Sequence, residues 1–144
     1  MSETMPDVEG AMRTWLRAQS GIQAVVAQRV FFGIPRNATE SDFPMITVAR
    51  VGGGDDQGDV PVDRALMQIS CWGSIDTNGN PLKSTATAVV NAVRSAVRGV
   101  RGKTELTASV DAFGINVESV VWLPDPNNDR PRYVVTVDVT AISS

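Results

Sequence analysis

The chain contains no histidine and only one cysteine, Cys71, among its 144 residues. Without histidine it cannot build a Ser-His-Asp or Cys-His triad, and it lacks the commonest general base near neutral pH. One cysteine allows no intrachain disulfide, and a structural zinc site needs four cysteine or histidine ligands. We therefore predict that the chain is not an enzyme, that it holds no metal or cofactor, and that Cys71 is a buried, unreactive thiol.

Basic clusters and long apolar runs are also missing. Sixteen acidic residues outnumber 13 basic ones, giving a net charge of −3, whereas a nucleic-acid-binding surface needs clustered lysine and arginine. No apolar run approaches the roughly 20 residues that span a bilayer. The N-terminal ten residues lack the basic start and apolar stretch of a secretory signal. These absences predict a protein made in the cytoplasm that binds neither membranes nor specific DNA sites.

The apolar pattern predicts a single domain over residues 1–144 that combines helices and strands. Helical spacing indicates helices at 7–19, at 22–30 after an interruption by Gly21, and most clearly at 82–98. The apolar stripes consist of Val8, Met12, Trp15 and Leu16 in the first helix and Leu82, Ala86, Val89, Val90, Val93 and Val97 in the last. Strands are predicted at 45–51, 64–73, 104–113, 115–123 and 132–142. This order is typical of an α+β fold, a mainly antiparallel sheet with helices packed on one face.

Two polar segments, 52–63 and 124–131, are predicted to be mobile loops. The first combines glycines and aspartates with no basic residue, and the second holds three prolines. The aspartates could instead hold a cation or pair as acid and base, but glycine-rich backbone would not pre-organise them. In the second loop, Arg130 stands where a calcium loop needs glycine. We favour partner contacts for both loops, made by Gly52, Gly53, Gly54, Asp55, Asp56, Asp59, Asn127, Asn128 and Asp129.

The three tryptophans divide into two groups. Trp15 lies on the apolar stripe of its helix and Trp72 lies beside Cys71, so both are predicted to pack in the core or against the sheet. Trp122 comes just before the proline-rich loop, which makes it the better candidate for a partner contact.

One long stretch of the chain resembles a known family. The run RVFFGIPRNATESDFPMITVARVGGGDDQG, followed by RALMQISCWG and a helix near residue 82, resembles the phage tail-completion family, which includes the tail terminators of long-tailed, siphovirus-type bacteriophages. The resemblance covers roughly residues 7–100. The residues that carry it are Arg29, Val30 and Phe31; Phe43, Pro44 and Ile46; Gly52 to Gly58; and Ile69, Cys71, Trp72 and Gly73.

The resemblance implies a structural protein of the virion, located at the head-proximal end of the tail. A ring of identical subunits, typically a hexamer, would cap the tail tube protein, end tube growth and join the head-tail connector protein, while DNA passes through the lumen. A head-completion or connector (neck) subunit of the same virion is the alternative that this reasoning leaves open. A small carboxylate-based enzyme is the alternative from a different class.

Overall fold

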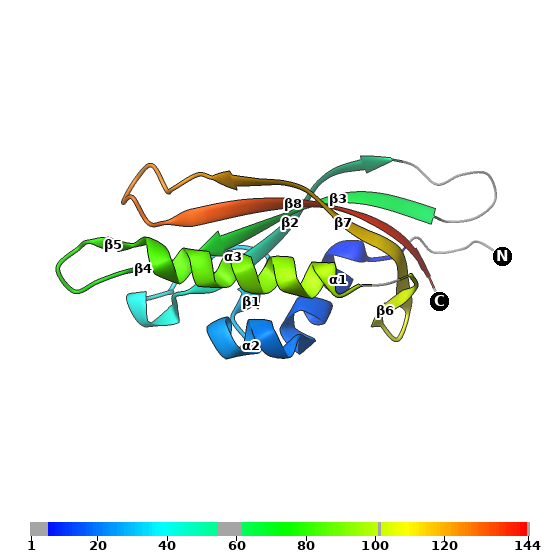
Figure 1. Cartoon of the computed structure of the whole chain (residues 1–144), viewed down its shortest axis with the longest axis horizontal. Helices are drawn as coiled ribbons and strands as arrows, with labels where there is room; N and C mark the ends of the chain where they lie inside the picture. The colour runs from blue at the N-terminus through cyan, green and yellow to red at the C-terminus, as the bar shows by residue number, and fades with distance from the viewer. Residues whose placement is uncertain (1–5, 55–61, 101, 144) are drawn as a thin grey trace.

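The computed structural model describes residues 6–54, 62–100 and 102–143. Within these residues, a curled six-stranded sheet carries three α-helices on one face (Figure 1). The elements are α1 Val8–Ala18, α2 Ser20–Val26, β1 Val30–Phe31, the 3-10 helix η1 Glu40–Asp42, β2 Met45–Gly54, β3 Val62–Trp72, β4 Ser74–Ile75, β5 Pro81–Leu82, α3 Lys83–Arg98, β6 Thr104–Thr107, β7 Val110–Trp122 and β8 Arg132–Ser143. The predicted α+β class is confirmed.

The sheet has the strand order β1-β2-β3-β8-β7-β6. All neighbouring strands are antiparallel except β1 and β2, which are parallel. The centre is the β3–β8 pair, whose register runs from Val62 opposite Ile142 to Trp72 opposite Arg132 without a shift. A separate small ladder joins β4 to β5, which the sequence pattern did not predict.

The first two helices lie close to their predicted positions, with one correction. In α1 the Asp7 side chain accepts a hydrogen bond from the Gly10 amide at 3.0 Å, and the whole predicted apolar stripe is buried. Gly21 does not interrupt the helices, because it lies inside α2 and the break falls at Gln19, whose backbone is extended. The predicted helix 22–30 is also too long. It ends at Val26, and Val30 already belongs to β1.

Helix α3 confirms the clearest helix predicted from the sequence. Its stripe from Ala86 to Val97 is buried against the sheet, and Gly99 follows as the C-terminal cap. The exception is Leu82, which is exposed because it precedes the helix and belongs to β5.

The strand predicted at 104–113 is in fact two strands. A turn at Ala108 and Ser109 separates β6 from β7, and Thr104 pairs back onto Ala112. Residues 110–122 form one long strand, which unites the second half of that prediction with the strand predicted at 115–123. The turn contains no glycine or proline, which are the usual sequence signals of a turn. The sequence pattern therefore indicated one continuous strand where the chain reverses direction.

The predicted loop 52–63 is shorter than expected at both ends. Gly52, Gly53 and Gly54 extend β2 and pair with Leu66, Ala65 and Arg64. Asp63 lies in β3 with only 3% of its surface exposed. The physical reason is an ion pair: both Nη atoms of Arg50 donate to the Asp63 carboxylate, the Nη2–Oδ1 distance being 2.7 Å. Asp55, Asp56 and Asp59 lie outside the described residues.

The buried tryptophans and the cysteine are where the sequence placed them. Cys71 and Trp15 belong to the main core between the sheet and the helices. Trp72 is buried on the sheet, where its Nε1 donates to Thr47 Oγ1 at 3.0 Å and the Arg132 guanidinium lies 4.6 Å from its ring. Both predictions of structural packing for these rings are confirmed.

Candidate functional site

The described glycines of the first segment predicted to contact partners, Gly52–Gly54, and the second segment, residues 124–131, lie at opposite ends of the sheet (Figure 1). The strand register shows this directly. Trp72, which pairs with Met45 and Arg132, marks the end that carries the β7–β8 loop. Arg64, which pairs with Gly54 and Thr140, lies near the other end. Gly52–Gly54 and residues 124–131 therefore lie at opposite ends of a single subunit.

Hydrogen bonds within the β7–β8 loop, residues 123–131, and to its neighbouring strand organise its backbone. The Leu123 amide donates to the Arg132 carbonyl and the Asp125 amide to the Arg130 carbonyl, both at 3.0 Å. The Asp125 carboxylate accepts from the Asn127 amide at 2.9 Å. The predicted contact residues Asn127, Asn128 and Asp129 are exposed at the tip. The loop thus holds these three side chains outward on a backbone that its own polar groups organise.

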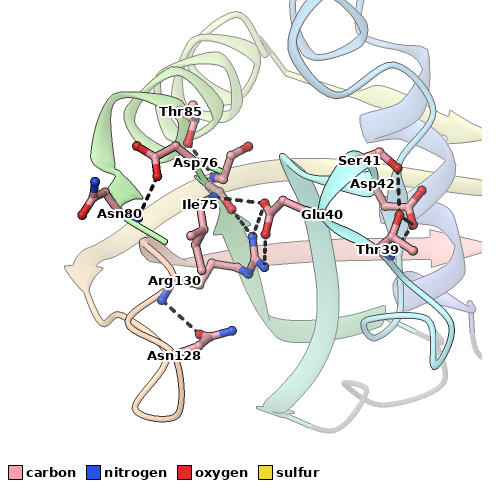
Figure 2. A network of polar contacts seen from close by, with 12 residues as sticks. Thr39, Glu40, Ser41, Asp42, Ile75, Asp76, Asn80, Thr85, Asn128 and Arg130 are labelled. Carbon is pink, nitrogen blue, oxygen red and sulfur yellow. Dashed lines mark hydrogen bonds and ion pairs between the residues drawn. The ribbon is translucent and has the colours of Figure 1, made fainter. Parts of the chain in front are cut away.

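Arg130 anchors this loop to the rest of the molecule (Figure 2). Its side chain is buried, and its two Nη atoms donate to the Glu40 carboxylate at 2.9 and 2.7 Å. Nη1 also donates to the Gly73 carbonyl at 3.0 Å, and the guanidinium lies 3.5 Å from the centre of the Phe43 ring. One buried cation therefore joins three segments that are far apart in the sequence.

Glu40 extends the network to the β4–β5 hairpin. Its carboxylate also accepts from the Ile75 amide at 3.0 Å, and the hydrogen bond from Arg130 lowers the pKa of Glu40. At the base of the hairpin, Thr85 Oγ1 accepts from the Ser74 amide at 2.7 Å. Figure 2 shows these groups converging. We call residues 40–43, 73–82 and 123–131 together the Arg130 end.

Exposed apolar side chains lie beside the Arg130 end. Trp122 is 40% exposed and Leu123 49% exposed. The Trp122 ring packs edge-on against Tyr133, with centroids 4.9 Å apart, and Lys83 Nζ lies 4.7 Å from the Trp122 ring centre. This gives Trp122 the rigid, half-exposed placement typical of an interface aromatic, although its role as a contact stays a prediction.

The opposite end of the sheet is held by Arg50. Besides binding Asp63, its Nε donates to the Gly52 carbonyl at 3.1 Å, and its amide donates to the Glu9 carboxylate of α1 at 2.8 Å. Gly53 has φ of +139°, and a Cβ there would lie 2.2 Å from the Arg64 carbonyl. Glycine is therefore required at Gly53 by both backbone angle and space.

Sequence reasoning missed the central pair of the Arg130 end. Arg130 entered the argument only because it disrupts a calcium-loop pattern, and Glu40 was not singled out. Ninety residues separate the two partners, so no local pattern could have joined them. The one signal was position, since Arg130 lies at the foot of the proline-rich loop beside a β-strand.

One surface groove has no side chain suited to acid-base chemistry. A groove of about 780 Å³ between α2 and α3 is lined by Trp15, Gln19, Ser20, Gly21, Asn91, Ala92, Ser95, Ala96, Gly99, Val100 and Thr104. None of these side chains is ionisable. Across residues 6–54, 62–100 and 102–143 no three metal-ligating side chains cluster together, and no helix is both long and apolar enough to cross a membrane.

Comparison with known proteins identifies the family. Residues 10–142 match the family model described as tail completion protein gp17. No curated protein matches the chain. A chain in a solved structure titled "Virion of native gene transfer agent (GTA) particle" is similar with a TM-score of 0.67 and 16% identity over 95% of both chains, a likeness that shows the shared fold. Because the family match extends over nearly the whole sequence, the chain belongs to the tail completion protein gp17 family, whose members are structural proteins of phage tails.

Proposed function

We propose that the chain forms a closed ring, a hexamer, at the head-proximal end of a phage tail tube, where it ends tube growth and presents the surface that joins the head. The observation that carries the proposal is the family match over residues 10–142. The charge is compatible with it, because six copies at −3 each carry −18, and an acidic ring repels the phosphates of DNA that slides through it.

The opposite placement of Gly52–Gly54 and the β7–β8 loop supports a bridging role. We assign the β7–β8 loop, with Asn127, Asn128, Asp129 and Trp122, to one neighbour in the virion. We assign Gly52–Gly54 and the aspartates at 55, 56 and 59 to the other. The two neighbours are the tail tube protein and the head-tail connector protein.

The test combines solution mass with tube binding. Light scattering of the purified protein, alone and with tail tubes, should give a closed oligomer or a species bound at one tube end only. The double substitution Asn127→Lys/Asn128→Lys should leave the ring intact and reduce joining, whereas Asn91→Lys on the exposed side of α3 serves as a matched control and should not. If the protein does not bind tail tubes, the proposed capping function is wrong. If the loop variant joins heads and tails as well as wild type, the assignment of the β7–β8 loop is wrong.

A further inference from the structure

The outer edge of β7 is open along most of its length. β6 pairs only with Val110, Asp111 and Ala112, so residues 114–122 have β8 on one side and no strand on the other among the described residues. Four successive residues, 116–119, are exposed there, followed by Val121 and Trp122. The only ionisable side chain in the open stretch is Glu118, which occupies a bulge. An exposed edge with apolar side chains and no lysine or proline is a surface built for contact.

At the opposite edge of the sheet, formed by β1 and β2, side chains of α1 hinder the addition of another strand. The Arg13 Nε atom donates to the Val30 carbonyl of β1 at 3.0 Å, and Glu9 accepts from the Arg50 amide of β2. Side chains of α1 therefore occupy backbone groups that an added strand would need. A neighbouring molecule would therefore contact side chains at this edge, not backbone groups.

That surface is cationic and aromatic. The guanidinium of Arg13 lies 5.0 Å from the Phe32 ring centre and that of Arg17 lies 5.8 Å from the Phe31 ring centre. Phe32 is 49% exposed, and Ile34 beside it is also exposed. We call Arg13, Arg17, Phe31, Phe32 and Ile34 the arginine patch.

The arginine patch lacks an anionic partner within the described subunit. Arg17 Nε is buried without a hydrogen-bond acceptor, and neither arginine forms an ion pair among the described residues. Desolvation, with a smaller contribution from the charge of Arg13, lowers the pKa of Arg17. Two adjacent guanidinium groups without an ion pair in the described subunit favour a carboxylate supplied by a neighbouring molecule.

The two surfaces lie at the same level of the sheet. One row of paired residues crosses five of the six strands, from Phe31 through Thr47, Ser70 and Val134 to Val121. The arginine patch and the open β7 edge therefore mark the two ends of the same cross-strand row. A head-to-tail ring needs such a pair of different, complementary surfaces on each subunit.

We propose that the ring closes by seating the β7 edge of one subunit, Val117, Glu118 and Val121, on the arginine patch of the next copy. Glu118 supplies the carboxylate that Arg13 and Arg17 lack, and the flanking valines cover Phe32 and Ile34. The alternative contact between two β7 edges would bring Glu118 toward the other Glu118, and like charges in that position repel. This inference rests on the proposed ring.

Charge exchange tests the pairing. Glu118→Arg and Arg17→Glu should each weaken self-association about tenfold or more, and the variant that carries both should recover it, because the pair is restored with reversed sign. Glu105→Arg on β6 and Arg94→Glu on α3 are matched controls that should assemble normally, since both positions are exposed outside the two surfaces. Circular dichroism checks that each variant is folded.

Cysteine crosslinking decides the orientation, because the native Cys71 is buried and leaves engineered thiols as the reactive ones. The variant Val117→Cys/Ile34→Cys should give a ladder of crosslinked oligomers with a bismaleimide, and Val117→Cys alone should stay monomeric on a denaturing gel. Dimers from Val117→Cys alone, or no rescue by charge exchange, would overturn the inference while ring formation and tube capping stand. Wild-type protein that neither oligomerises nor binds tubes would overturn the proposed function itself.

Discussion

Replacing Glu40 by glutamine tests whether Arg130 holds the three segments of the Arg130 end together. Glutamine keeps the size of the side chain but removes the charge and one strong acceptor. Arg130 is only 8% exposed, and breaking a buried pair costs about 3–5 kcal/mol. Because 45% of the Glu40 side chain is exposed, water can replace part of the interaction, and we expect a loss of about 1–2 kcal/mol.

A double-mutant cycle with Arg130→Met isolates the pair. The sum of the two single losses should exceed the loss in the double variant by a coupling energy of about 1–2 kcal/mol. For a domain of this size, Glu40→Gln alone should lower the Tm by roughly 3–8 °C. Urea unfolding followed by circular dichroism measures the free energies, provided that the denaturant slope stays constant across the four proteins, and thermal unfolding measures the Tm.

Glu105→Gln is the matched control, since Glu105 is exposed on β6 and has no ion pair within the described residues. It should change stability by less than about 0.5 kcal/mol. A coupling energy below about 0.3 kcal/mol in the cycle would refute the reasoning, because it would mean that Arg130 and Glu40 act independently.

The remaining predictions concern pH, packing and thiol chemistry. The pKa of Glu40 is lowered in the folded state, so the stabilisation by its carboxylate is present above the ordinary glutamate pKa of about 4.3 and is lost as the pH falls through the lower folded value. The difference in urea midpoint between wild type and Glu40→Gln should therefore shrink in acid. A difference that stays constant with pH would contradict this. Gly73→Ala should cost about 1–3 kcal/mol of stability, because a Cβ would lie 2.9 Å from both the Ala86 amide and the Pro131 ring, whereas Gly21→Ala has open space and should be neutral or stabilising in the same unfolding assay. Burial raises the pKa of the Cys71 thiol, so Ellman's reagent should label it only in denaturant, and stoichiometric labelling of the native protein would show that it is accessible.

The elements that could be predicted from the sequence are those whose pattern is local and long. Helix α3 has five buried residues at helical spacing, and β8 alternates buried and partly exposed residues over most of its 12 residues. Each such element defines its buried face before any tertiary contact is known. The α+β class and the helix-covered face of the sheet followed from them.

Elements defined by distant contacts could not be predicted. Gly52–Gly54 read as loop because glycine is unfavourable in strands, yet the Arg50–Asp63 pair and the close approach of Arg64 to Gly53 extend β2 through them. The Arg130–Glu40 pair was missed for the same reason. Trp122 was singled out because an aromatic residue beside a proline-rich loop is a local signal; the structure places it exposed at that end, and its partner contact stays a prediction.

The unbroken register of β3 with β8 also sets a length. Eleven paired residues at about 3.3 Å each make a stiff double strand of roughly 35 Å between the Arg130 end and the end held by Arg50. Backbone hydrogen bonds along the whole pair prevent it from stretching or shortening without breaking the ladder. A subunit that docks at both ends therefore acts as a molecular ruler, and every copy in a ring would hold its two neighbours at the same spacing.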